Sequence, residues 1–297
     1  MQRNNELIRL LKLIENTPCY LPEKVEEGIF YDLKRVKLID DEIRSSGSQY
    51  KRVSGKDYYR LYAQDSLENL SKEFSEILLV SSHADNLQKC SSYDDRTEYI
   101  KGCFDNAATN AVCVYLMKAL ELPRNVLFVF TADEEYHSEG AEHVARKLKN
   151  QFDNVNVIVL DVTYGFQNGV DFTIENDFIF RNAKGEKFIK QICNVAATSG
   201  YSWNFLKKTK SHEERYIQSE RIKQYMEEGC KSFSEVKGPD ETQKYKKKGF
   251  NTFSLCLPCS AENDLQMHDD SGFRISVQIL QNYTDFLRLV LQGYNCG

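Results

Sequence analysis

The sequence of 297 residues lacks any long apolar run. No stretch approaches the roughly 20 apolar residues that a membrane-spanning helix needs. Residues 1–20 are polar and charged throughout, and they lack the apolar run of about 7–15 residues found in a signal peptide. The sequence therefore predicts a cytoplasmic protein with no membrane partner.

The chain also lacks an excess of positive charge. Its 39 Lys and Arg residues face 44 Asp and Glu residues, and the net charge is −5, so no nucleic-acid partner is expected. Internal repeats and low-complexity segments are missing as well, which excludes repeat architectures.

Paired cysteines of the disulfide-framework kind are not expected either. The cysteine count is nine, and an odd number without a signal peptide indicates a reducing compartment. Cys256 and Cys259 stand three residues apart, but no second Cys or His pair accompanies them at metal spacing. We interpret them as buried thiols.

What the sequence does contain is an alternation of strand and helix patterns. Short, nearly continuous apolar runs predict strands buried on both faces; they span 77–80, 126–130, 155–160 and 253–257. Apolar residues at helical spacing predict helices over 5–15, 106–120, 138–149 and 274–291. The segments 29–38 and 57–63 are rich in Tyr, Val, Ile and Leu and are predicted to be strands. The pattern predicts an α/β fold with a mostly parallel sheet and helices on both faces.

A single catalytic domain over residues 1–297 is the simplest organisation of this length. Residues 1–75 would supply a helix and strands packed on that domain. The segment 207–248 is densely charged, and two interpretations stay open for it: a solvated helix and loop, or an insertion near the active site that serves as a lid or an oligomer contact.

Polar side chains follow three of the predicted buried strands at the point where each strand ends. His83 and Asp85 follow the first, Glu134 and Glu135 follow the second, and Asp161 follows the third. Because the carboxyl ends of strands in an open α/β sheet form one edge, these side chains can converge there. Histidine nitrogens and carboxylate oxygens are ligands that zinc accepts, so the pattern indicates a metal site.

Two further candidates are weaker when taken alone. Asp105 precedes a predicted helix that begins at Asn106, so it is either a ligand or only an N-cap. His268 lies in a polar segment before the last predicted helix, and a lone histidine in such a place is usually a surface residue.

Taken together, these elements resemble zinc peptidase family 28, the di-zinc aminopeptidases related to glutamate carboxypeptidase and glutaminyl cyclase. The resemblance covers about residues 76–290, where five separated elements occur in the order of the family. They are His83-x-Asp85, Gly102-x-x-Asp105-Asn106-Ala107, Glu134-Glu135 followed by Gly140-Ala141, Leu160-Asp161 and His268. The resemblance implies a three-layer zinc-peptidase-like fold and a peptide substrate, and it leaves a homo-oligomer open.

The resemblance also implies a role for each matching residue. Two zinc ions are expected per chain: His83 and Asp161 would bind one, Glu135 and His268 the other, and Asp105 would bridge them. Asp85 would orient His83 through a hydrogen bond. Glu134 would be the general base that deprotonates the attacking water.

The sequence departs from the family in the glycine usual soon after the bridging aspartate, where Thr109 stands. Asp240 resembles an acidic position that the family carries ahead of its last core strand, and an exposed loop residue is an equal interpretation. Two other functions remain open. One is a glutaminyl cyclase that uses one zinc, which the intact His83-x-Asp85 pair disfavours; the other is a non-catalytic binding domain, which would be expected to lose ligands.

Overall fold

A computed structural model describes most of the chain. The described residues are 2–17, 33–55, 58–85, 94–95, 98–134, 137–163, 170–176, 183–207, 241–261 and 273–294.

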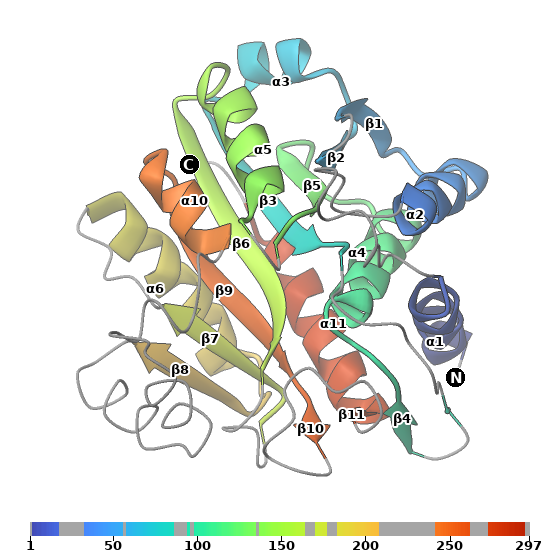
Figure 1. The fold of residues 1–297 in the computed structure, drawn as a ribbon. Coiled ribbons are helices and arrows are strands. Elements are labelled where there is room, and N and C mark those ends of the chain that lie inside the picture. Colours follow the sequence, from blue (N-terminus) through green and yellow to red (C-terminus); the bar gives the residue numbers. More distant parts are fainter. Residues whose placement is uncertain are drawn as a thin grey trace, which may run out of the picture.

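An eight-stranded mixed sheet runs through the molecule in the order β1-β2-β5-β3-β6-β9-β7-β8 (Figure 1). The four central strands β5, β3, β6 and β9 are parallel, while β2 and β7 join them antiparallel on either side. The strands of this sheet are β1 Lys51–Ser54, β2 Tyr59–Ala63, β3 Glu76–His83, β5 Val126–Thr131, β6 Asn154–Thr163, β7 Phe172–Asn176, β8 Trp203–Lys207 and β9 Asn251–Pro258. The α/β fold with a mostly parallel mixed sheet is thereby confirmed.

A second, antiparallel sheet has the order β10-β11-β4. It consists of β4 Tyr99–Lys101, β10 Ser260–Ala261 and β11 Phe273–Ser276. After β4, the first strand of this sheet in sequence, the chain continues directly to the start of the buried helix α4.

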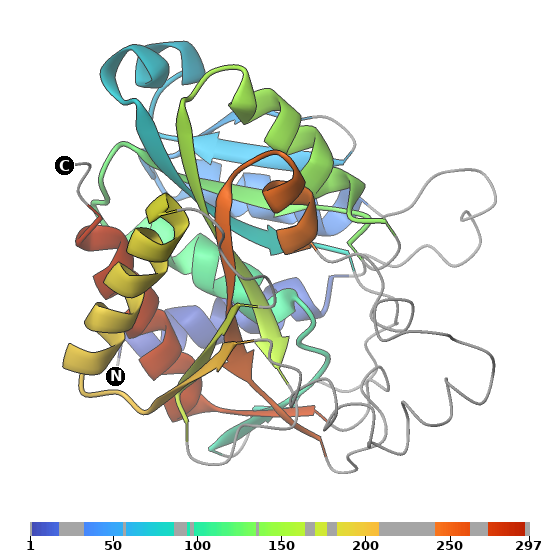
Figure 2. The ribbon, with the colours of Figure 1, turned by 90° about the vertical axis from the view of Figure 1, so that its left-hand side faces the viewer.

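Helices cover both faces of the large sheet, as the view onto its β8 end shows (Figure 2). The helices are α1 Gln2–Glu15, α2 Leu33–Ser45, α3 Leu67–Glu73, α4 Ala107–Ala119, α5 Glu139–Lys149, α6 Ala183–Thr198, α10 Glu241–Lys247 and α11 Val277–Gln292. One face packs against α4, α6 and α11, and the other packs against α3, α5 and α10. Among the described residues, no helix is both long and apolar enough to cross a membrane.

The alternation of side chains along β3 explains the two cores. Leu78 and Val80 point into the larger core with α4, while Ile77 and Leu79 point into the smaller core with α5, as successive residues of a strand must. The helix α4 is buried along residues 107–117, because α1 and α2 pack on the side of α4 that faces away from the sheet (Figure 1).

Several element predictions need correction. Residues 33–38 belong to the helix α2 rather than to a strand, because Val36, Ile39 and Ile43 are its buried residues and their spacing is helical. Residues 29–32 lie outside the described part. Residues 274–276 belong to β11, so the last helix begins at Val277. Within the charged segment 207–248, residues 208–240 lie outside the described part and α10 follows them.

We predict that Leu11→Ala lowers the free energy of unfolding by about 2–5 kcal/mol, since it removes a fully buried side chain from the core that α1 shares with α4. The exposed neighbour Lys12 provides the control, and Lys12→Ala should change the unfolding free energy by less than about 1 kcal/mol. Chemical denaturation followed by circular dichroism measures both. Equal effects of the two substitutions would contradict the burial of α1.

Candidate metal centre

The parallel ladder brings two of the predicted ligands to the same edge of the sheet. His83 is the last residue of β3, and Asp161 lies in β6, where Ser82 pairs with Leu160. His83 is also the register partner of Thr131 at the end of β5. The convergence of polar residues at the carboxyl ends of β3, β5 and β6 therefore follows from strand register.

Three predicted ligands surround a common point. His83 Nε2 lies 3.0 Å from Asp105 Oδ1 and 3.9 Å from Asp161 Oδ1. One ligand atom of each of the three residues lies within 4.8 Å of the ligand atoms of the other two. The side chain of His83 is only 2% exposed, whereas Asp105 and Asp161 are partly accessible.

These donors fit a zinc ion. Ligand atoms about 2.0–2.1 Å from a tetrahedral ion stand roughly 3.3–3.4 Å apart, which lies between the two distances measured from His83 Nε2. One imidazole nitrogen and two carboxylate oxygens are also the hard and borderline donors that zinc accepts.

The other nitrogen of His83 is held by Asp85. Nδ1 lies 3.2 Å from the backbone oxygen of Asp85 and 3.6 Å from its carboxylate Oδ1. With Nδ1–H donating to the backbone oxygen of Asp85, Nε2 keeps its lone pair and faces Asp105 and Asp161, while the Asp85 carboxylate lies near Nδ1 without a hydrogen bond to it.

Electrostatics favours a positive charge at this point. Burial by itself lowers the pKa of His83, but the carboxylates of Glu134, Asp105, Asp161 and Asp85 outweigh it and raise the pKa well above its usual value. For Asp161, desolvation raises the pKa, and Asp105 adds to the rise while His83 opposes it. A cluster of this kind stabilises a cation, whether a proton or a metal ion.

Glu134 lies beside the three ligands without being one of them. Its Oε2 is 4.0 Å from His83 Nε2, and its side chain is partly exposed. β5 ends at Thr131, so Glu134 lies beyond the strand, where adjacent side chains need not point to opposite faces of a sheet. The buried Asp133 before it has φ of 64°, a left-handed conformation that is uncommon outside glycine.

Asp105 approaches the site from the segment before α4. The N-cap of α4 is Asn106 and the helix begins at Ala107, so the interpretation of Asp105 as the N-cap is not supported. The side chain of Asn106 donates to the backbone oxygen of Leu160 at 2.8 Å, which ties the start of α4 to β6. The Asp105–Asn106 peptide bond is cis.

Three residues named from the sequence cannot be placed. Glu135, His268 and Asp240 lie outside the described residues. The structure therefore describes every residue that the family resemblance assigns to the first zinc. Of those that it assigns to the second zinc, the structure describes only Asp105. Cys259 is a buried thiol whose pKa is raised by burial, in keeping with an unreactive side chain.

A buried carboxylate that the sequence did not single out lies beneath the site. Glu241 is 1% exposed and accepts hydrogen bonds from Ser81 Oγ at 3.2 Å and from Thr131 Oγ1. Ser81 precedes His83 by two residues, and Thr131 is the register partner of His83. The one feature of the sequence that could have pointed to Glu241 is its position next to Asp240.

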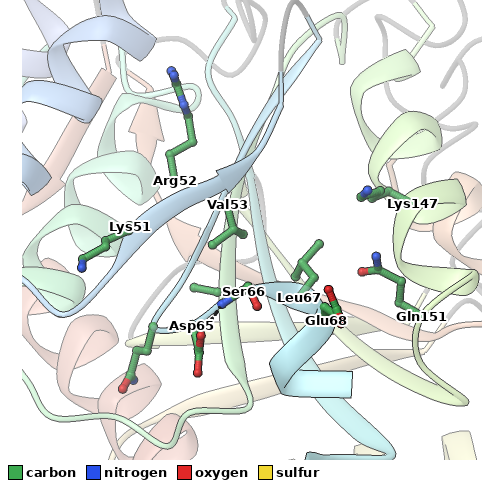
Figure 3. A pocket seen from close by; sticks show the side chains of 11 residues that line it. Lys51, Arg52, Val53, Asp65, Ser66, Leu67, Glu68, Lys147 and Gln151 are labelled. Carbon is green, nitrogen blue, oxygen red and sulfur yellow. Dashed lines mark hydrogen bonds between the residues drawn. The ribbon is translucent and has the colours of Figure 1, made fainter. Parts of the chain in front are cut away.

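A hollow of about 460 Å³ lies elsewhere, between β1, the end of β2 and the end of α5 (Figure 3). Its lining includes Lys51, Asp65, Lys147 and Gln151 but none of the predicted ligands that the structure describes. Because β2 runs antiparallel to β5, the hollow lies towards the amino ends of the central strands. Ligands of open α/β sheets bind at the opposite edge, so we do not assign the chemistry to this hollow.

Comparisons with solved structures give the same fold at low sequence identity. The TET1 peptidase of Pyrococcus horikoshii is 11% identical with a TM-score of 0.66, covering 97% of this chain and 100% of that one. An aminopeptidase from the archaeon Desulfurococcus kamchatkensis is 10% identical with a TM-score of 0.62, covering 98% and 96%. A glutaminyl cyclase of Macrostomum lignano is 12% identical with a TM-score of 0.53, covering 98% and 91%.

A search of curated protein sequences found no match. The sequence profile of peptidase family M28 matches residues 66–264, a range that contains His83, Asp105, Glu134 and Asp161. This match extends over more than half of the chain and includes the ligands assembled above. The chain therefore belongs to peptidase family M28.

Proposed function

We propose that the chain is a zinc-dependent aminopeptidase, which hydrolyses N-terminal residues from peptides. The observation that carries the proposal is the buried imidazole of His83, whose Nε2 faces Asp105 and Asp161 at ligand spacing. Membership in family M28 supports peptide-bond hydrolysis as the reaction class. The similar structures include aminopeptidases, which supports the more specific activity.

In this proposal two zinc ions occupy the centre. His83, Asp161 and Asp105 hold the first ion, and Asp105, Glu135 and His268 hold the second. Zinc, when bound, supplies Lewis-acid chemistry that polarises the scissile carbonyl and makes water acidic near neutral pH.

Glu134 acts as the general base. Its carboxylate takes a proton from the attacking water and later gives the proton to the leaving amine. Glu134 suits this role because its Oε2 lies beside the three ligands, 4.0 Å from His83 Nε2, while part of its side chain is exposed and can meet water.

Asp85 acts through His83. Its contacts with Nδ1 fix which nitrogen carries the proton and keep the ring in one orientation. Of the described residues, His83 and Asp161 stand at the ends of β3 and β6, the proposed base Glu134 lies just beyond β5, and Asp105 enters from the segment before α4.

Glutaminyl-peptide cyclisation is the second candidate, because a glutaminyl cyclase is among the similar structures. The intact His83 with its orienting Asp85 supports two metals and thus the aminopeptidase. A peptide is the proposed partner, and a cytoplasmic location stays a prediction. The TET1 peptidase can assemble into a tetrahedron or a large octahedral shell, and we extend the proposal to a homo-oligomer of this chain.

Replacing Glu134 by glutamine should reduce turnover by about 10²–10⁴-fold while zinc binding and folding are retained, since an amide cannot accept the proton. Steady-state kinetics on aminoacyl amides, together with zinc content, measure the effect. The exposed Glu121 provides a matched control, and Glu121→Gln should leave turnover unchanged. Full activity in Glu134→Gln would remove the proposed base.

Loss of a ligand should lower the zinc content. We expect Asp105→Ala to affect both ions and His268→Ala to affect one, as measured by elemental mass spectrometry on purified protein. His143 stacks on Tyr58 with ring centroids 5.0 Å apart, so His143→Ala is the control and should keep the full content. Two zinc ions per chain in both ligand variants would refute the assignment.

Substrate assays separate the two candidate reactions. The aminopeptidase proposal expects nearly two zinc ions per chain and chelator-sensitive release of N-terminal residues from aminoacyl amides. One zinc ion per chain, with cyclisation of N-terminal glutamine peptides and no hydrolysis, would replace it with the cyclase. Absence of metal even after zinc is added would indicate a non-catalytic binding domain.

A further inference from the structure

The position of Asp105 relative to His83 is not set by the large sheet. β3 pairs residue by residue with β5 and β6, so strand register fixes where His83 lies relative to Asp161 and to the turn of Glu134. Asp105 instead follows β4, a strand of the small sheet, and precedes α4. Its 3.0 Å approach to His83 therefore depends on contacts outside the large sheet's ladder.

Glu15, the last residue of α1, contacts the segment 102–105 from behind. The side chain is buried, with the residue 1% exposed, and its Oε1 accepts a hydrogen bond from the backbone N–H of Cys103 at 3.1 Å. A Cβ atom at Gly102 would lie 2.7 Å from the same oxygen, so glycine at this position lets the carboxylate reach the backbone. A hydrogen bond that is shielded from water in this way restrains the backbone of the segment.

Arg35 in α2 makes the corresponding contact with the segment 83–85. The residue is 2% exposed, and its Nη1 donates to the backbone oxygen of Ala84 at 3.1 Å. Ala84 lies between His83 and Asp85, and the backbone oxygen of Asp85 contacts Nδ1 of His83. Among the described residues, the acceptors of Arg35 are this oxygen and that of Thr17, both on the main chain.

Both residues come from helices that precede the segment matched by the family M28 profile, which begins at residue 66. α1 and α2 lie beside α4 (Figure 1), and their apolar residues share the core of that helix. Glu15 and Arg35 add to this packing a buried hydrogen bond to the backbone of each of the two segments, and buried polar groups need such partners.

We propose that Glu15 and Arg35 are positioning residues of the metal centre. From the two N-terminal helices they hold the segments 102–105 and 83–85 at the separation at which Asp105 and His83 bind one zinc ion. This inference rests on the proposed function in so far as zinc is the ion bound.

The test measures the dissociation constant of Zn²⁺ by competition with a fluorescent chelator, using the full-length chain. Glu15→Ala and Arg35→Met should each weaken zinc binding by about 10–100-fold, the usual effect of removing a group that supports metal ligands. Glu15→Gln should bind zinc within about threefold of wild type, because its amide oxygen can still accept from Cys103.

Matched controls come from the same two helices. Glu6 in α1 pairs with Arg9 and Lys118, and Lys37 in α2 is exposed. Glu6→Ala and Lys37→Met should keep zinc affinity within about threefold of wild type. The unfolding free energy of each metal-free variant separates a general loss of stability from a specific loss of metal binding.

Gly102→Ala provides an independent perturbation of the same contact. It keeps both charged residues but places a methyl group against the Glu15 carboxylate, so zinc affinity should again fall by about 10-fold or more. This variant keeps the proposal testable if Glu15→Ala does not fold.

The outcomes separate this inference from the proposed function. If wild type binds zinc and the folded Glu15, Arg35 and Gly102 variants bind it equally well, the positioning role is overturned. A loss of affinity in Glu6→Ala as large as that in Glu15→Ala would also overturn it, since stability alone would then explain both. If wild type itself binds no zinc, the proposed function fails first.

Discussion

The structure depends on a buried imidazole that is surrounded by carboxylates. His83 is almost completely buried, and Asp85, Asp105, Glu134 and Asp161 all lie within 4.0 Å of its ring nitrogens. Such a cluster is stable only if a positive charge compensates the carboxylates. The carboxylates raise the pKa of His83 because protonation of the ring would supply this positive charge. A metal ion bound by the same residues would supply it as well.

The large sheet fixes the positions of His83 and Asp161 relative to each other. Parallel register places His83, Thr131 and Asp161 on one face at one edge of the sheet. On the same face, two residues before His83, Ser81 donates a hydrogen bond to the buried Glu241. The strands are continuous apolar runs with helices on both sides, so they have little freedom to slide. The rigid edge allows β3 and β6 to present His83 and Asp161 at a spacing that suits zinc, while Asp105 reaches the same point from outside this sheet.

The sequence predicts the part of the site that depends on strand ends. Asp161 follows an apolar run directly and His83 follows one after two serines, and neighbouring parallel strands bring their carboxyl ends to one edge. It does not predict the helix α2, because the helical spacing of Val36, Ile39 and Ile43 is hidden among residues with high strand propensity. Nor does it reveal Glu15, Arg35 or Glu241, since their contacts with Cys103, Ala84 and Ser81 join segments at least 49 residues apart in the chain, and no local pattern records such a contact.

The contacts that position Asp105 come from two different parts of the chain. The segment matched by the family profile contains the predicted ligands that the structure describes and the strands that carry them, yet Asp105 lies on a segment that is not paired into the large sheet. Its position depends on Asn106 bonded to β6 and on Glu15 bonded to Cys103. The first contact lies within the matched segment and the second comes from outside it. Changes in α1 can therefore alter the metal centre while every ligand is retained.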